Sequence, residues 1–158
     1  MANLSFSHIS LNCRDPIASE QFYTRHFGFH RARFIPLGDR AIVFLKLGQM
    51  YLELFQAEGE LPVPVPIKDG YAYPGWRHIA FQVGDVDEKL AAMGDEAHIT
   101  LGPLNFDEFI PGWRSVWIAD PDGNIIEVSQ GYVDPDQPPP SLISDVGESG
   151  QLQISLHS

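Results

Sequence analysis

Two stretches of this sequence decide its fold: HISLNCRD at residues 8–15 and HIAFQVGD at residues 78–85. They align at a shift of 70 residues (78 minus 8), and their His, Ile and Asp positions are identical. A second pair, MYLELF at residues 50–55 and NIIEVS at residues 124–129, aligns at a shift of 74 (124 minus 50) with a glutamate at the same place in each. Such recurrence predicts that the chain is built from two copies of one structural module.

Each copy begins with an alternating stretch followed by a helix signal. Apolar residues occupy every second position from Ile9 to Cys13, so His8 lies on the opposite face of the expected strand. Asp15 followed by proline is typical of a helix start, as is Asp85, which has a glutamate three residues further on. Gly28 and its counterpart Gly94 are expected to end the two helices.

We therefore predict an α+β fold in which two βαβββ modules form an open, cupped sheet. The first module spans residues 4–56, the second spans 76–131, and a linker rich in proline and glycine covers 57–75. Residues 1–131 would form one domain, which suits a chain of 158 residues with 44% apolar composition. Residues 132–158 are an acidic, proline-rich C-terminal tail, either disordered or contributing an edge strand through Leu152, Ile154 and Leu156.

Composition excludes several classes of partner. The net charge of −11 and a pI near 4.7 disfavour binding to nucleic acid. No segment approaches the roughly 20 apolar residues that a membrane-spanning helix requires, and no targeting signal is evident at the N-terminus. We expect a cytoplasmic protein with a small-molecule ligand, and we expect the single cysteine, Cys13, to be a buried apolar residue with no catalytic role.

Four residues together indicate a metal site. Glu53 and Glu127 each lie within an apolar strand, where a carboxylate is unfavourable to bury unless it is paired. If the two sheets curve toward each other, both glutamates meet His8 and His78 where the modules join. Imidazole nitrogen and carboxylate oxygen suit one divalent ion, namely Ni, Zn, Co, Mn or Fe(II), and leave positions for water or substrate.

A purely structural interpretation is the alternative. A lone strand histidine is usually a hydrogen-bonded residue, and a lone glutamate usually faces solvent. Recurrence of the pair at equivalent points of both modules favours the metal site. The remaining histidines do not follow this pattern, and we expect them to be solvated: His26, His30, His98 and His157.

These features resemble the vicinal oxygen chelate superfamily, which includes glyoxalase I, extradiol dioxygenases and bleomycin-resistance proteins. The resemblance covers residues 4–131 and is strongest in HIAFQV at residues 78–83 and DPDGNIIE at residues 120–127. It implies the paired-module fold and a metal at the centre of the cup. The His, Glu, His, Glu ligand set is most similar to that of glyoxalase I.

Glyoxalase I-like chemistry implies a lyase or isomerase that acts on the adduct of a 2-oxoaldehyde and a thiol, or on a related small carbonyl compound. A metal-bound enediolate would form when a carbon-bound proton is removed. The base would be Glu127 or Glu53, with Glu127 preferred. Small bacterial members imply a homodimer with sites shared between subunits.

The resemblance is incomplete around the thiol site. Asn12 stands where glyoxalases often have an arginine that contacts glutathione, and Ala57 stands where they often have asparagine, so the tripeptide clamp is not evident. The candidates for substrate binding are of two kinds. Four residues lie on the same strand face as the ligands, namely Asn12, Phe55, Gln82 and Ser129, and Trp113 belongs to the apolar loop 106–113.

Two other functions remain open. The chain resembles acyl-CoA epimerases and extradiol dioxygenases of the same superfamily, although the epimerases commonly carry Gln at the position of Glu53. A non-catalytic drug-binding or metabolite-binding protein of bleomycin-resistance type is the third possibility, and the intact ligand set argues against it.

Overall fold

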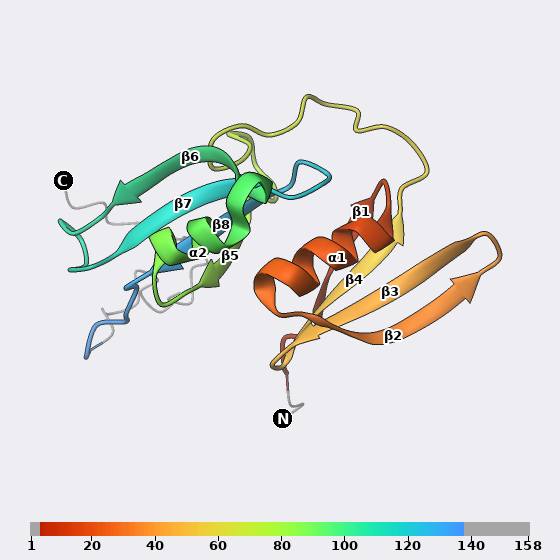
Figure 1. Cartoon of the computed structure of the whole chain (residues 1–158), viewed down its shortest axis with the longest axis horizontal. Helices are drawn as coiled ribbons and strands as arrows, with labels where there is room; N and C mark the ends of the chain where they lie inside the picture. Colours follow the sequence, from red (N-terminus) through yellow and green to blue (C-terminus); the bar gives the residue numbers. More distant parts are fainter. Residues whose placement is uncertain (1–3, 138–158) are drawn as a thin grey trace, which may run out of the picture.

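The computed structural model describes residues 4–137, which form two four-stranded mixed sheets (Figure 1). The elements of module one are β1 (His8–Cys13), α1 (Pro16–Phe27), β2 (His30–Leu37), β3 (Arg40–Leu47) and β4 (Met50–Gln56). Those of module two are β5 (Ile79–Gln82), α2 (Val86–Met93), the 3-10 turn η1 (Gly94–Glu96), β6 (His98–Asn105), β7 (Arg114–Ala119) and β8 (Ile125–Gln130). The strand orders are β1-β4-β3-β2 and β5-β8-β7-β6, and the first strand runs parallel to the last in each module. The predicted α+β fold of two βαβββ modules is confirmed.

Both helices begin and end where the sequence predicts. The Asp15 carboxylate accepts a hydrogen bond of 2.9 Å from the backbone N–H of Ile17, and Pro16 occupies the first turn, where no N–H is needed. Gly28 ends α1 with φ of 72°, a left-handed conformation that glycine adopts without steric cost. In module two, Asp85 caps α2 by accepting a bond of 2.8 Å from the backbone N–H of Glu88.

Strand alternation decides what each sheet buries. Leu11 of β1, with Leu52 and Leu54 of β4, packs into the core, against which α1 lies. The side chains between them point to the other side of the sheet, which we call its open face. His8 of β1 and Glu53 of β4 belong to this face and are less buried than their neighbours.

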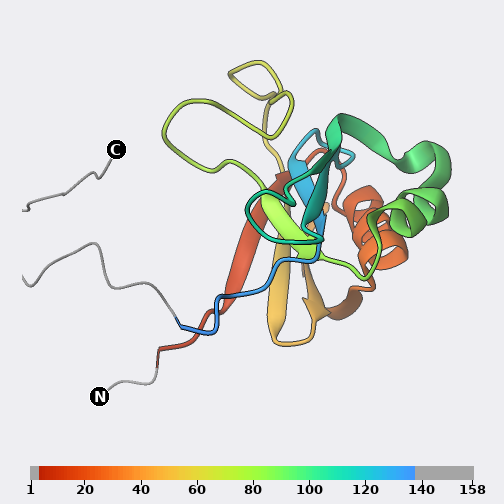
Figure 2. The same ribbon diagram turned by 90° about the vertical axis from the view of Figure 1, so that its left-hand side faces the viewer.

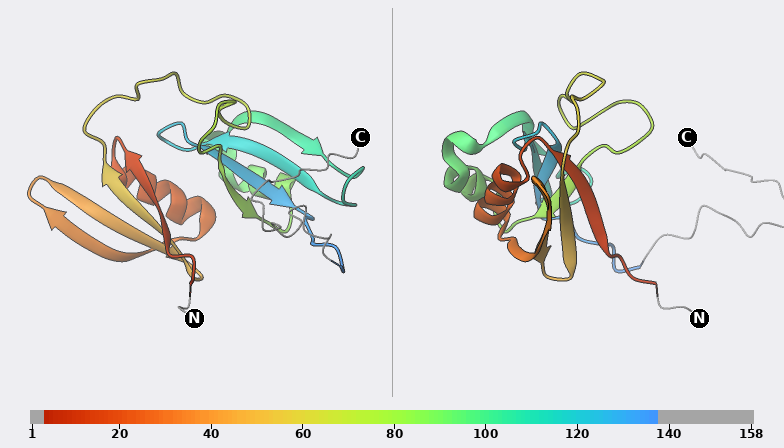
Figure 3. Two further views of the ribbon diagram at one scale, coloured as in Figure 1. Left: turned by 180° about the vertical axis from the view of Figure 1, so that it is seen from behind. Right: turned by 90° about the vertical axis from the view of Figure 1, so that its right-hand side faces the viewer.

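The two modules lie side by side with their helices on the same side. In the edge-on view of Figure 2, α1 and α2 both lie to the right of the strands, and Figure 3 shows the sheets from behind, where both open faces are presented. The modules are joined through α1. Phe27 contacts Phe81 of β5 with ring centroids 4.7 Å apart, and the hydroxyl of Tyr23 donates to Asp120, which precedes β8, at 2.9 Å. A single hydrophobic core therefore runs across both modules.

One expectation about the histidines is wrong. His26 is buried on the inner face of α1, where its ring packs against Phe22 at 5.1 Å and its Nε2 lies 2.7 Å from a carboxylate oxygen of Glu96 in module two. Its position one helical turn after Phe22 carries it to the junction between modules. His30 and His98 are exposed, as expected.

Cys13 is buried and free, as predicted, and burial raises the pKa of its thiol to about 12. It is therefore an inert core residue at neutral pH. Within residues 4–137, no helix is both long and apolar enough to cross a bilayer. The interpretations of the tail beyond residue 137, including the edge strand at Leu152, Ile154 and Leu156 and the solvated His157, lie outside the described residues.

Candidate functional site

The first His–Glu pair lies on the open face of module one. His8 begins β1, and Glu53 lies on the neighbouring strand β4, directly opposite Ser10. The Nε2 atom of His8 is 3.4 Å from Oε2 of Glu53, and the hydroxyl of Ser10 donates to the same oxygen at 2.5 Å. The glutamate side chain is only 15% exposed. The pair is thus preformed by strand register, with one carboxylate oxygen fixed by a serine.

The second pair repeats this arrangement in module two. The Nε2 atom of His78 is 3.0 Å from Oε2 of Glu127, whose side chain is 13% exposed. The hydroxyl of Ser115, on β7, donates to the other oxygen of Glu127 at 2.8 Å. On its far side, Nδ1 of His78 is 2.7 Å from the backbone carbonyl of Asp69 in the linker. Because a carbonyl oxygen can only accept, Nδ1 carries the hydrogen, and a neutral ring then presents the lone pair of Nε2 to the carboxylate.

This geometry fits a divalent metal ion. A lone pair facing a carboxylate at 3.0 Å is unfavourable unless a cation lies between them or the imidazole is protonated. Ligand atoms about 2.0–2.2 Å from a metal lie roughly 3 Å apart when they are at right angles, close to the 3.0 Å and 3.4 Å of the two pairs. The hydrogen bond from Nδ1 of His78 to a carbonyl is also the usual way of orienting a metal-binding histidine.

Each pair has an aromatic neighbour on the third strand of its sheet. Phe44 is the register partner of Glu53, and Trp117 is the register partner of Glu127. Each aromatic ring lies 6.3 Å, centroid to centroid, from the histidine of its own pair. The indole N–H of Trp117 is buried and has no hydrogen-bond partner among residues 4–137. An unpaired buried donor of this kind is unusual in folded proteins.

Sequence reasoning did not identify these supporting residues. A usable signal was present, because Ser10 lies two positions after His8 and Trp117 alternates in phase with Ser115 on its strand. Their pairing with the glutamates depends on strand register, which the sequence alone does not give.

The four predicted ligands come together as two separate pairs. Within the described part of the chain, no three or more His, Cys, Asp or Glu side chains form one metal-sized group. The physical reason is the docking of α1 against module two. Because both helices lie on one side, the two open faces point in the same general direction and do not face each other (Figures 2 and 3).

The remaining candidate residues have different surroundings. The indole N–H of Trp113 donates to the hydroxyl of Ser129 at 3.0 Å, and that hydroxyl lies 2.9 Å from the hydroxyl of Ser115, whose single hydrogen is donated to Glu127. These three side chains therefore form a hydrogen-bonded chain that leads to Glu127. The amide of Gln82 donates to the carbonyl of Tyr132 at 3.3 Å. Asn12 and Phe55, by contrast, line a cavity at the end of module one.

Fold and site together define a class of small α+β proteins with paired βαβββ modules and one His–Glu pair on the open face of each sheet. A sequence model of the Glyoxalase/Bleomycin resistance protein/Dioxygenase superfamily matches residues 5–128. The chain belongs to this superfamily, which confirms the resemblance seen in the sequence.

Individual relatives agree with this assignment. The uncharacterized protein YwkD of Bacillus subtilis is 29% identical over 121 residues, which cover 75% of this chain and 90% of YwkD. A glyoxalase family protein from Enterococcus faecalis has a similar structure, with 27% identity, a TM-score of 0.62, and coverage of 82% of this chain and 99% of that one. A lactoylglutathione lyase from Agrobacterium tumefaciens is 27% identical, with a TM-score of 0.52 and coverage of 83% and 96%.

A more distant structure shares the fold alone. The fosfomycin resistance protein FosX of Listeria monocytogenes, solved with Mn(II) and sulfate, is 18% identical, with a TM-score of 0.58 and coverage of 84% of this chain and 95% of that one. The fold thus occurs in a lactoylglutathione lyase and in a fosfomycin resistance protein, and by itself it does not select between such activities.

Proposed function

We propose that this protein is a divalent-metal-dependent lyase or isomerase of glyoxalase I type that acts as a homodimer. The His8–Glu53 pair of one subunit would face the His78–Glu127 pair of a second copy, and the four side chains would hold one ion. The observation that carries the proposal is the presence of two His–Glu pairs with N–O separations of 3.4 Å and 3.0 Å, each on an open face. Ni, Zn, Co, Mn and Fe(II) all suit such a donor set.

A second copy is needed because one chain presents both pairs on the same side. Two open faces from two copies, brought together in a closed two-fold arrangement, bury both pairs at once and generate two equivalent sites. Such an arrangement also removes the half-exposed ring of His8 from solvent.

When bound, the metal would supply Lewis acidity that stabilises negative charge developing on neighbouring substrate oxygens. The carboxylates would move a proton between adjacent carbons of the substrate. Both oxygens of Glu127 are engaged, one by Ser115 and one by His78. In the first pair, Ser10 and His8 both contact Oε2 of Glu53. The other oxygen, Oε1, has no hydrogen-bond partner within residues 4–137. These contacts favour Glu53 Oε1 as the proton acceptor, in place of the Glu127 that the resemblance favours, because Glu127 is held more firmly.

The surrounding side chains would orient these groups. Ser10 and Ser115 fix one oxygen of each glutamate, and the carbonyl of Asp69 fixes the ring of His78. Phe44 and Trp117 would exclude water from the pairs, which strengthens the electrostatic interactions within the site.

Metal binding and turnover test the proposal in two steps. Purified protein titrated with Ni, Co, Mn, Fe(II) or Zn should bind about one ion per subunit, measured by elemental analysis. Ni and Co should also quench the tryptophan fluorescence, to which Trp117 beside the His78–Glu127 pair contributes. Glu53→Gln and Glu127→Gln should weaken binding by roughly 10–100-fold or more. Glu88→Gln, an exposed residue of α2, is the matched control and should leave binding unchanged.

Turnover is then measured with methylglyoxal premixed with glutathione or with the neutral thiol 2-mercaptoethanol. Absence of binding for all five metals would end the metalloenzyme proposal. Metal binding without turnover of either adduct would remove the glyoxalase assignment and leave the metal site.

A further inference from the structure

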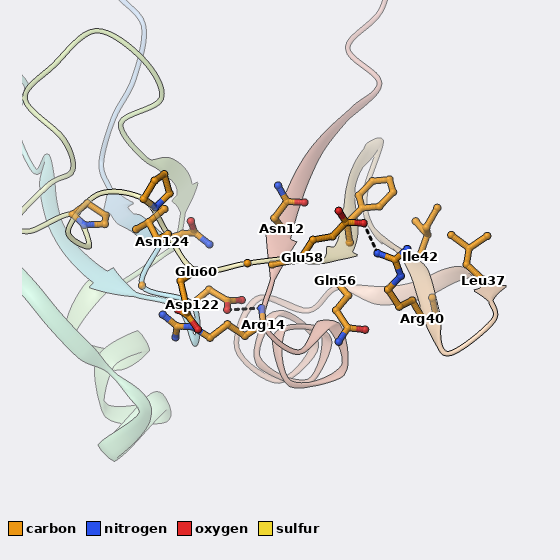
Figure 4. Close-up of a pocket in the computed structure, with 18 of the residues that line it drawn as sticks. Asn12, Arg14, Leu37, Arg40, Ile42, Gln56, Glu58, Glu60, Asp122 and Asn124 are labelled. Carbon is orange, nitrogen blue, oxygen red and sulfur yellow. Dashed lines mark hydrogen bonds and ion pairs between the residues drawn. The ribbon is translucent and has the colours of Figure 1, made fainter.

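A cavity of about 720 Å³ lies beyond the His8–Glu53 pair, further along β1 and β4. It lies at the ends of β1, β3 and β4, beside the start of the linker and the turn between β7 and β8 (Figure 4). Asn12 and Phe55 are register partners and line this cavity, and they follow Ser10 and Glu53 by two residues on their strands. Two residues of strand span roughly 6–7 Å on the same face. The cavity therefore continues the open face away from the pair, at a distance that one small substrate can bridge.

Apolar side chains form much of the cavity wall. Ile42 and Phe55 line it from the middle of the sheet, Leu37 lines it from the end of β2, and Leu61 lines it from the linker. Leu37 is 51% exposed and Leu61 is 49% exposed, so residues 4–137 leave two large apolar side chains at the cavity partly uncovered. An apolar group in the cavity would remove this surface from water.

The charged side chains around the cavity carry more negative than positive charge. Two arginines and three carboxylates line it, which gives a net charge of −1 (two minus three): Arg14, Arg40, Glu58, Glu60 and Asp122. Arg40 pairs with Glu58 at 2.6 Å. The backbone N–H of Arg14 donates to Asp122 at 2.8 Å, a bond that Figure 4 marks with a dashed line. The guanidinium of Arg14 forms no ion pair among residues 4–137, so the cavity has one unpaired cation beside three carboxylates. Phosphates or several carboxylates would meet repulsion there, which the net charge of −11 on the chain increases.

One polar group in the cavity is available for direct recognition. The side-chain amide of Asn12 has no hydrogen-bond partner among residues 4–137, and it offers both a donor and an acceptor. Such a group matches an amide or a hydroxyl on a neutral ligand and carries no charge that would attract a carboxylate.

We infer that this cavity binds the non-reacting part of the substrate and selects an uncharged, largely apolar group over one that carries phosphates or several carboxylates. This inference rests on the proposed function, because the ligand is a substrate only if its reacting part lies at the His–Glu pairs. Its consequence is that the thiol or carrier group of the substrate is small and neutral, unlike glutathione or coenzyme A.

Binding of two unreactive thioethers to the full-length protein tests this inference. S-hexyl-N-acetylcysteamine is neutral, whereas S-hexylglutathione has the same alkyl group with two carboxylates and an ammonium group. We expect the neutral compound to bind at least tenfold more tightly by isothermal titration calorimetry, and Phe55→Ala to weaken it about tenfold. Equal or tighter binding of S-hexylglutathione would overturn the inference.

A pair of charge-reversed variants separates the local effect from net charge. Glu60→Lys should improve binding of S-hexylglutathione severalfold because Glu60 borders the cavity and has no ion-pair partner within residues 4–137. Glu88→Lys makes the same change on the exposed side of α2, and it should leave binding unchanged. An equal improvement in both variants would show that only the net charge matters and would refute a selective cavity.

Failure of this inference is distinguishable from failure of the proposed function. Glu53→Gln should lose metal affinity and still bind the neutral thioether with a Kd within threefold of wild type. Neutral-ligand binding in a protein that binds no metal supports the cavity assignment while the enzyme proposal falls. Metal binding together with a preference for S-hexylglutathione supports the metal site of the proposed function and overturns the cavity inference.

Discussion

Removal of one hydroxyl group at the junction of the modules should destabilise the whole fold. Tyr23 of α1 is fully buried, and its hydroxyl donates to Oδ2 of Asp120 at 2.9 Å across 97 residues of sequence. Burial, together with the neighbouring charge of Asp120, raises the pKa of Tyr23 well above its usual value, so the hydroxyl stays protonated as a donor. Burial also raises the pKa of Asp120, and the hydrogen bonds it accepts from Asn124 and Tyr23 oppose that shift.

The expected magnitude for Tyr23→Phe follows from these contacts. The phenyl ring keeps its packing against Phe22 and Phe29, whose centroids lie 5.4 Å and 5.9 Å away, so only the hydrogen bond is lost. Asp120 retains its bonds from Asn124 and from the backbone of Asp122. A buried hydrogen bond to a charged acceptor contributes about 1.5–3 kcal/mol. The free energy of unfolding should therefore fall by about that amount.

Urea unfolding followed by circular dichroism at pH 7, with linear extrapolation to water, measures the change. Tyr132→Phe is the matched control because its hydroxyl bonds to Asp134 at the surface, at 3.2 Å, and its removal should cost within about 0.5 kcal/mol. If Tyr23→Phe is no more destabilising than Tyr132→Phe, the bond does not hold the modules together and the reasoning is refuted.

The remaining predictions concern acid stability and backbone conformation. Hydrogen bonds from His26 and Arg25 lower the pKa of Glu96 below its ordinary 4.5. The ionised Glu96 carboxylate therefore stabilises the folded state fully above pH 4.5, and this contribution is lost as the pH falls through the lowered pKa. Glu96→Gln should flatten the acid limb of a plot of urea midpoint against pH, and an unchanged slope would contradict this. Gly131→Ala should lower the melting temperature, because φ is 75° and the new Cβ would lie 2.1 Å from the carbonyl oxygen of Gly112; the left-handed conformation alone costs about 1–2 kcal/mol. Gly59→Ala meets no atom within 4 Å and serves as the control, and an equal loss in both variants would refute the steric account.

Local patterns in the amino-acid sequence were enough to define the two modules and the sheet face on which each candidate ligand lies. Strand alternation placed His8 opposite the buried side of β1, and the aspartates and glycines that begin and end the helices acted through their immediate neighbours. These are local effects, which depend on residues within a few positions of one another, so a periodic pattern is sufficient to reveal them. The internal repeat then assigned Glu127 the same position as Glu53.

The arrangement of the two modules, and the side chains that support the site, follow from packing between distant parts of the chain. Burial of His26 and the bond from Tyr23 to Asp120 both arise because α1 docks against module two. The partnership of Ser115 with Glu127 requires the register of β7 on β8. Contacts of this kind join residues far apart in the chain and depend on how two packed surfaces fit, which no short stretch of sequence encodes. The sequence therefore predicted that the four ligands share one face of the protein, but it did not predict that the packing of α1 leaves them as two separate pairs within one chain.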